Sequence, residues 1–369
     1  MRGPTVPAYG ESTLADLLPS LGAHLGVRGA VDRLGLPEAD RYLLVLVDGL
    51  GWHQLTEYAD HAPYLAGLTG RTITSGVPST TATSITSLGT GLVPGQHGIA
   101  GYSFWYPPAR AVLNTLKWPA ELSGLDVQPQ LTYFERLASA GVRTATVAPA
   151  FFAGSGLTTA AVRGPGFLPV TDERDRARRV DLAVQAVTGS GRAFGYFYER
   201  LLDHAGHAHG VGSPDWLAEL EGADALLAQL RAALPGDVRL LVTGDHGMVN
   251  VPDDSRLVVE DEPDLLAGVT ALAGEGRFRQ LMTADPAAVA DRWRDRLGER
   301  AWVRTRTEAI EDGWFGQVSP RLADQFGDVL VAMANDGAVM SRALPKELTL
   351  VGMHGSLTAA ELDVPLLAD

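Results

Sequence analysis

The sequence predicts an α/β protein with a doubly wound, mostly parallel sheet and helices on both faces. Two observations lead to this prediction. Short, continuous apolar runs alternate with amphipathic helical patterns along the chain, which is typical of a parallel sheet covered by helices. Acidic residues follow several of these runs, at the edge where such sheets bind ligands. The predicted strands are 42–47, 71–76, 141–149, 192–199, 238–247 and 327–336.

Two of the helical segments between these strands carry clear start signals. Residues 13–25 form an amphipathic pattern with leucines on one face, and Thr13 with Asp16 marks its start. Another helix begins with Ser213 as N-cap and Pro214 in the first turn, followed by a stripe of apolar residues. These signals set the predicted helix starts.

The composition is compatible with one large domain. A chain of 369 residues with 46% hydrophobic residues can bury a sizeable core. Residues 251–325 interrupt the alternating pattern because they are irregular and charged, with one helix near 286–297. We therefore expect a single catalytic domain over residues 1–369, with 251–325 as an inserted α+β cap.

Charge and cysteine content restrict the ligands. The net charge of −14 disfavours nucleic-acid polymers, so a phosphate ligand would need local positive charge, for which bound metal is the obvious source. The chain has no cysteine, so metals must bind through oxygen and nitrogen. No apolar run could span a membrane, and residues 1–13 lack the apolar segment of a signal peptide, which predicts a cytoplasmic protein. Nothing in the sequence sets the oligomeric state.

A run of hydroxyl residues lies within Val77–Ile99. Ser79, Thr80 and Thr81 stand at the start of a predicted helix, where unpaired N–H groups and the helix dipole favour an anionic phosphate. Such residues are also ordinary helix caps, so the run alone leaves both interpretations open. The surrounding carboxylates and imidazoles favour the phosphate site.

Possible metal ligands follow the predicted strands or lie in the tail. They are Asp48, Asp203, His207, Asp245, His246 and His354. Because the carboxyl ends of parallel strands meet at one edge of a sheet, we expect these side chains to gather there. Taken singly, Asp48 also suits a simple turn and His354 a surface position. His204 and His209 compete as ligands, but we expect them to face solvent or to support the ligands.

Together the donors suggest a pair of metal ions. Imidazole and carboxylate donors suit zinc better than magnesium. Two ions about 3.5–4 Å apart would form a clamp for displacement at phosphorus. The sequence therefore predicts two Zn²⁺ as cofactors.

The order of motifs resembles one superfamily of phosphate-handling enzymes. Asp48 is followed by PSTTATS, PGQHGI, DHAGH, GDHGM and MHGS, over residues 43 to 356. This order resembles the alkaline phosphatase superfamily, and within it most closely the type I phosphodiesterase/nucleotide pyrophosphatase family. The resemblance implies an alkaline-phosphatase-like doubly wound fold, in agreement with the strand pattern.

The resemblance also implies roles for single residues. It makes Thr81 the nucleophile, with Thr80 as the neighbouring alternative, and gives His97 a supporting role. One zinc ion would be held by Asp203, His207 and His354. The other would be held by Asp48, Asp245 and His246, with the Thr81 oxygen approaching it.

The implied activity is hydrolysis of a small phosphate ester, at a phosphodiester or pyrophosphate bond, through a phospho-threonine intermediate. Tyr102 stands near the position where related diesterases carry an asparagine that binds a phosphate oxygen, so we expect Tyr102 to contact substrate. Asn114 and Lys117 are further candidate contacts. The alternatives are a phosphomonoesterase or phosphonate hydrolase on the same site, or a metal-dependent phosphomutase. A non-catalytic metal-binding protein is disfavoured, because the ligands and the nucleophile are all present.

Overall fold

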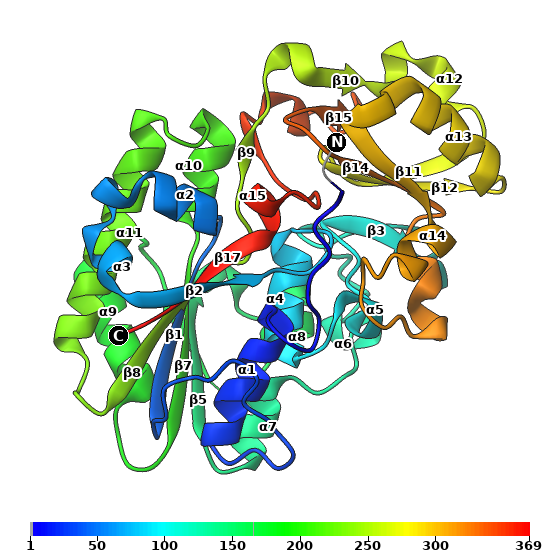
Figure 1. Cartoon of the computed structure of the whole chain (residues 1–369). Helices are drawn as coiled ribbons and strands as arrows, with labels where there is room; N and C mark the ends of the chain where they lie inside the picture. Colours follow the sequence, from blue (N-terminus) through cyan, green and yellow to red (C-terminus); the bar gives the residue numbers. More distant parts are fainter. Residues whose placement is uncertain (1–2, 165) are drawn as a thin grey trace.

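A seven-stranded sheet forms the centre of the protein (Figure 1). The computed structural model describes residues 3–164 and 166–369. The strands of this sheet are β1 (Arg41–Val47), β2 (Thr69–Thr74), β5 (Arg143–Pro149), β6 (Phe167–Val170), β7 (Ala193–Glu199), β8 (Val238–Thr243) and β17 (Asp363–Ala368). Their order is β2-β17-β8-β1-β7-β5-β6. Strand β1 is parallel to β7 and β8, and β5 is parallel to β6 and β7, whereas β17 is antiparallel to both of its neighbours.

Helices cover both faces of the sheet, as the continuous apolar strands require. On one face, Leu44 and Leu46 of β1 join a core with four helices, and on the other, Leu43 and Val45 join a second core. The helices of the first face are α1 (Leu14–His24), α4 (Thr81–Thr90), α7 (Tyr133–Ser139) and α8 (Gly156–Val162). Those of the second face are α2 (Trp52–Glu57), α3 (Pro63–Gly67), α9 (Arg176–Val187), α10 (Leu201–His209) and α11 (Pro214–Ala233). The predicted fold class is confirmed.

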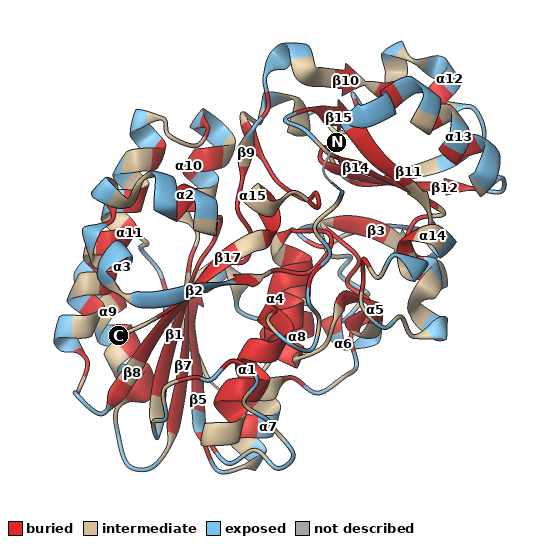
Figure 2. Ribbon diagram, in the orientation of Figure 1, coloured by how far each residue is buried: buried red, intermediate tan, exposed pale blue. Residues whose placement is uncertain are grey.

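Predicted helix starts agree with the structure. Thr13 is the N-cap of α1, and its hydroxyl donates to Asp16 Oδ2 at 2.8 Å. Ser213 is the N-cap of α11, and its Oγ accepts from the Trp216 N–H at 3.2 Å. Figure 2 shows that the inner strands and most of α1 and α4 are buried. Helix α4 thus carries its hydroxyls inside the core.

A smaller antiparallel sheet lies beside the main one. Its order is β11-β12-β14-β13, and helix α13 packs on it through the buried Trp293. The strands are β11 (Val269–Glu275), β12 (Phe278–Thr283), β13 (Ala301–Thr305) and β14 (Val329–Met333), accompanied by α12 (Pro263–Leu266), α13 (Pro286–Leu297) and α14 (Arg306–Glu311). We call residues 263–333 the cap. The strand predicted at 327–336 is β14, and it pairs within this cap sheet, which therefore runs past residue 325.

Short pairs of strands connect the two sheets. They are β3 (Ser103–Tyr106) with β4 (Ala111–Asn114), β9 (Val249–Asn250) with β16 (Gly352–Met353), and β10 (Arg256–Val258) with β15 (Ala338–Met340). The remaining α-helices are α5 (Pro94–His97), α6 (Gly124–Val127) and α15 (Ala359–Leu362). Within the described residues, no helix combines the length and apolar character needed to cross a membrane.

Candidate metal centre and active site

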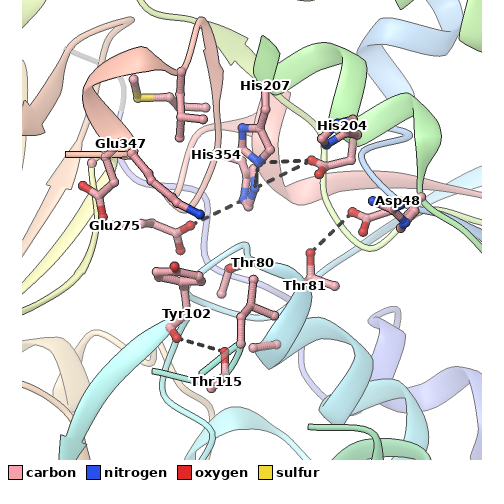
Figure 3. A pocket seen from close by; sticks show the side chains of 18 of the residues that line it. Asp48, Thr80, Thr81, Tyr102, Thr115, His204, His207, Glu275, Glu347 and His354 are labelled. Carbon is pink, nitrogen blue, oxygen red and sulfur yellow. Dashed lines mark hydrogen bonds and ion pairs between the residues drawn. The ribbon is translucent and has the colours of Figure 1, made fainter. Parts of the chain in front are cut away.

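A cavity of about 540 Å³ lies at the carboxyl edge of the main sheet (Figure 3). Its walls include Asp48, Thr81, Asp203, His207 and His354, which come from four separate segments of the chain. The cavity therefore brings together most of the side chains that the sequence singled out.

The turn after β1 places two of these carboxylates. Asp48 follows β1 directly, and its N–H donates to Glu199 O at the end of β7 at 2.8 Å. Gly49 has a φ of +75°, and a Cβ at that position would lie 3.0 Å from Asp203 Cα. Only glycine allows both this backbone conformation and this close approach. The Asp-Gly pair thus brings the β1 turn against helix α10, which carries Asp203.

Thr81 lies at the first position of helix α4, directly after the N-cap Thr80. Its Oγ1 is 3.4 Å from Asp48 Oδ1 and 3.2 Å from His246 Nε2. Thr81 therefore faces both a carboxylate and an imidazole at the positive end of a helix.

Asp48, Asp245 and His246 form the first donor set. Asp48 Oδ1 is 3.3 Å and Asp245 Oδ2 3.6 Å from His246 Nε2. Tyr198 donates to Asp48 Oδ2, and the Gly49 N–H donates to Asp245 Oδ1 at 3.0 Å. Each carboxylate is thus anchored through one oxygen and directs the other toward the His246 ring.

Asp203, His207 and His354 form the second donor set. Asp203 Oδ1 is 3.4 Å from His207 Nε2 and 3.9 Å from His354 Nε2, and the two Nε2 atoms are 3.3 Å apart. The Asp203 oxygen is also close to His246, whose ring stacks on that of His354 with centroids 3.5 Å apart. The two donor sets are therefore adjacent, with His246 between them.

Backbone carbonyls orient all three imidazoles. The Nδ1 atoms pair with carbonyl oxygens: His207 with Gly352 (2.8 Å), His246 with Gly247 (3.0 Å) and His354 with Ser79 (2.9 Å). A carbonyl can only accept, so each Nδ1 carries a proton, and in the neutral ring that a metal ion requires each Nε2 would present a lone pair. These lone pairs point at one another and at carboxylate oxygens, and metal-ligating histidines have this orientation.

Two carboxylate oxygens of the donor sets lack the positive partner that a metal ion would supply. Among the described residues, Asp203 Oδ1 and Asp245 Oδ2 are buried and have no hydrogen-bond partner. Buried carboxylate oxygens without partners are costly, and facing lone pairs repel. A cation between them would remove both costs, so the residues fit a metal centre with oxygen and nitrogen ligands.

Comparison with known proteins places the chain in a family. The family model for type I phosphodiesterase/nucleotide pyrophosphatase matches residues 42–357. The chain belongs to this family. Its members are metal-dependent phosphodiesterase- or pyrophosphatase-type hydrolases, so the protein is an enzyme of this class. A sequence search of curated proteins finds no match.

Solved structures of this phosphodiesterase family and its relatives share the fold. Murine ectonucleotide pyrophosphatase/phosphodiesterase 5, an inactive threonine-to-alanine variant in complex with AMP, has a TM-score of 0.71 and 18% identity, covering 89% of this chain and 87% of that one. Phosphonoacetate hydrolase from Sinorhizobium meliloti 1021, in complex with phosphonoformate, has a TM-score of 0.69 and 20% identity, covering 90% of both chains. The alkaline-phosphatase-like fold follows from these likenesses.

Burial and mutual repulsion shift the pKa values of the carboxylates in this phosphodiesterase-family site. Burial, with the charge of Asp48, raises the pKa of Asp245 well above its ordinary value, and burial also raises the pKa of Asp203. The pKa of Asp48 is lowered, because the hydrogen bond and charge of His246 outweigh burial. Burial and the positive charge of His246 lower the pKa of His354. Bound cations would stabilise the ionised carboxylates.

The predicted substrate contacts are placed differently. Tyr102 lines the cavity. Asn114 does not, because its Oδ1 accepts from the N–H groups of Leu116 and Lys117 in a turn. Lys117 is exposed and is not among the residues that line the cavity, so its contact with substrate stays a prediction. Lys346, from the chain after β15, lines the cavity instead.

The positions of His204, His209 and His97 are compatible with the solvent-facing or supporting roles expected of them. His204 is exposed on the cavity wall, and His209 lies 3.9 Å from Asp215 on the outside of α10. His97 is buried, with Nδ1 accepting from the Ile99 N–H and Nε2 paired with Ser87 Oγ. Burial lowers the pKa of His97 to about 3, so it is neutral and supports helix α4.

Besides Lys346, sequence reasoning missed Tyr198 and Glu275, which also line the cavity. Tyr198 anchors Asp48, and the parallel register of β1 with β7 would have placed it beside the end of β1. Glu275 ends β11 in the cap, and no sequence signal connects it with the main sheet. Burial raises the pKa of Glu275 to about 8.

Proposed function

We propose that the protein is a two-zinc phosphohydrolase that cleaves phosphodiester or pyrophosphate bonds through a phospho-threonine ester of Thr81. One observation carries the proposal. Thr81 Oγ1 lies within 3.4 Å of Asp48 Oδ1 and 3.2 Å of His246 Nε2, at the N-terminus of α4. The same atoms of Asp48 and His246 belong to the first donor set, so a metal held there would meet the Thr81 oxygen.

The two donor sets divide the metals between them. Asp48, Asp245 and His246 would hold one ion, and the second set, Asp203, His207 and His354, the other. The mixture of imidazole and carboxylate favours zinc. When bound, two zinc ions would supply Lewis-acid stabilisation of charge on the attacking, phosphoryl and leaving oxygens.

The chain itself provides the nucleophile and its setting. Thr81 Oγ1 loses its proton to solvent and attacks phosphorus, a phosphoryl ester forms on Thr81, and the bond from phosphorus to the leaving oxygen breaks. Water then cleaves that ester and restores the hydroxyl. The free N–H groups at the start of α4 favour the anionic phosphoryl oxygens throughout. Tyr102 can donate its O–H to a non-bridging oxygen of a singly charged diester.

Phosphonate or monoester hydrolysis is the second candidate. Lys346 on the cavity wall adds a positive charge that would suit a substrate with an additional anionic group. The structural likeness to phosphonoacetate hydrolase also supports this candidate. A metal-dependent phosphomutase would instead isomerise a sugar phosphate without releasing phosphate or alcohol.

The test compares neighbouring threonines on zinc-reconstituted protein. Thr81→Ala is expected to abolish hydrolysis of bis(p-nitrophenyl) phosphate and to retain zinc, because each ion keeps its other ligands. Thr81→Ser should remain active, since only the hydroxyl is used. Thr80→Ala is the matched control, and loss of activity there with retention in Thr81→Ala would shift the nucleophile by one residue. Elemental analysis should find two zinc ions per chain, and a single ion would contradict the paired centre.

Tyr102→Phe probes the choice of substrate. Loss of one hydrogen bond in the transition state, about 1.4 kcal/mol, is expected to lower kcat/KM for the diester by about tenfold. Wild-type rates higher on p-nitrophenyl phosphate than on the diester, with a large loss in Lys346→Ala, would favour the monoesterase candidate.

A further inference from the structure

A smaller pocket adjoins the main cavity beside Thr81. It has a volume of about 60 Å³ and lies between helices α4 and α8 and strands β5, β6 and β7. We call it the side pocket. Four residues line both the side pocket and the main cavity, namely Thr81, Leu116, Phe152 and Tyr198. A phosphorus atom under attack by Thr81 would therefore have the side pocket next to it, and one of its substituents could enter there.

The lining of the side pocket is mostly apolar. It includes the buried residues Ile85 of α4, Leu157 and Val162 of α8 and Ala148 of β5, together with Phe167 of β6. Among the described residues, no charged side chain lines the side pocket. A charged group that entered it would thus lose its hydration without gaining an ionic partner.

Most hydroxyl groups around the side pocket already have partners or are covered. Tyr198 donates to Asp48 Oδ2, and Ser155 Oγ bonds to Thr158 Oγ1 at 3.0 Å and accepts from the Thr158 N–H at 3.2 Å. The Tyr196 hydroxyl is buried, so it presents almost no surface to a bound group. These residues contribute mainly carbon surface, and the side pocket therefore favours an apolar group over water.

The volume of the side pocket limits what it can hold. An engineered apolar cavity of about 150 Å³ in another protein accommodates benzene. The side pocket has less than half of that volume, so it has room for an alkyl chain of about three carbons but not for an aromatic ring. A ring on the same substrate would stay in the main cavity of about 540 Å³.

We propose that the side pocket binds a short alkyl substituent of a phosphodiester, while the leaving group occupies the main cavity. This proposal rests on the proposed diesterase function and names the substituent that the same site prefers. Thr81 directs its oxygen toward Asp48 and His246 and also lines the side pocket, so attack at phosphorus leaves the substituent beside the pocket. Each methylene buried there should raise kcat/KM by about fourfold, because its apolar surface leaves water.

The test uses alkyl p-nitrophenyl phosphates, in which the leaving group is constant. On zinc-reconstituted protein, kcat/KM is expected to rise by roughly tenfold from the methyl to the propyl ester. The hexyl ester should fall below the propyl ester, because its last carbons find no room in the side pocket. The 2-hydroxyethyl ester has nearly the shape of the propyl ester but ends in a hydroxyl, so it should react no better than the methyl ester.

Two variants change the volume of the side pocket in opposite directions. Ala148→Leu fills it and should bring the propyl-to-methyl ratio of kcat/KM to near one. Leu157→Ala enlarges it and should shift the best substrate from the propyl to the pentyl ester, which keeps the test decisive if Ala148→Leu does not fold. Leu350→Ala is the matched control, because Leu350 lines the main cavity and not the side pocket, and it should keep the wild-type ratio. A general loss of activity cancels in these ratios.

The possible failures can be told apart. Equal wild-type kcat/KM on the methyl and propyl esters would refute the alkyl site while leaving diesterase activity established. A rise that continues to the hexyl ester, or a 2-hydroxyethyl ester that matches the propyl ester, would overturn the short apolar class. If Leu350→Ala changes the ratio as much as Leu157→Ala, the alkyl group lies in the main cavity and the proposal is wrong. If wild-type protein hydrolyses neither these esters nor bis(p-nitrophenyl) phosphate, the proposed function itself fails.

Discussion

The buried ion pair between Arg277 and Glu361 offers a sharp test of how the cap is joined to the main sheet. Both side chains are 0% exposed. Arg277 Nε and Nη2 donate to Glu361 at 2.9 and 2.6 Å, and Nη1 donates to backbone carbonyls of Asn335 and Gly337. Glu361 Oε1 also accepts from the Ser356 N–H at 3.0 Å, two residues after His354. The pair thus links the cap to the loop that carries a predicted metal ligand.

Arg277→Met should be strongly destabilising. The substitution leaves a carboxylate buried without a counter-charge and two carbonyls without donors. Removing one partner of such a pair costs about 3–5 kcal/mol. With an unfolding entropy of about 2.1 cal/mol/K per residue over 369 residues, this cost corresponds to a fall in Tm of about 4–6 °C.

Urea unfolding and differential scanning calorimetry would measure the loss. Arg174→Met is the matched control, because Arg174 pairs with Glu219 but is 69% exposed, so at most about 1 kcal/mol is expected. Arg277→Met combined with Glu361→Leu removes both charges and should recover part of the loss. If Arg277→Met costs no more than Arg174→Met, burial of the pair does not govern its contribution.

Two further predictions concern the buried His97 and Gly49, a glycine with a positive φ. Burial lowers the pKa of His97 from its ordinary 6.5 to about 3. At mildly acid pH the His97 ring therefore binds a proton only in the unfolded chain, so the free energy of unfolding decreases as the pH falls. Between pH 6.5 and pH 5 the free energy of unfolding should fall by about 2 kcal/mol through His97. Urea unfolding of His97→Asn should lack this contribution. If the wild type and His97→Asn lose stability equally over this range, the low pKa assigned to His97 is contradicted. Gly49→Ala should lower the free energy of unfolding by about 1–2 kcal/mol because of the positive φ, and by a further amount because the new Cβ would lie too close to Asp203. Gly29→Ala, with φ +78° and nothing within 4 Å, should show the φ cost alone.

Most of the main sheet could be predicted because its strands are buried on both faces. Continuous apolar runs such as 42–47 are diagnostic of that environment. The C-terminal strand β17 escaped prediction, since Asp363–Ala368 is short, contains Pro365 and runs antiparallel. The sequence also could not predict which sheet β14 joins, because an apolar run indicates a buried strand but not its partner strands.

The donor sets were predictable for a different reason. Asp48 and Asp245 follow strands of one parallel sheet, so the fold itself brings them to one edge. Side chains from the cap have no such constraint. Lys117 was chosen by nearness in sequence to Tyr102, whereas Lys346 and Glu275 reach the cavity only through the placement of the cap.

The position of β17 has a consequence for the order in which the chain can assemble during synthesis. Residues 363–368 pair with β2 (Thr69–Thr74) on one side and with β8 on the other. Within the described residues, β2 pairs with no other strand of this sheet. Until residues 363–368 have been synthesised and have left the ribosome, β2 therefore lacks this partner strand, and its backbone groups can pair with wrong strands. The hydrogen bond from the Ser75 N–H to Leu362 O at 2.8 Å, shortly before the proposed nucleophile Thr81, likewise forms only once this part of the chain is available.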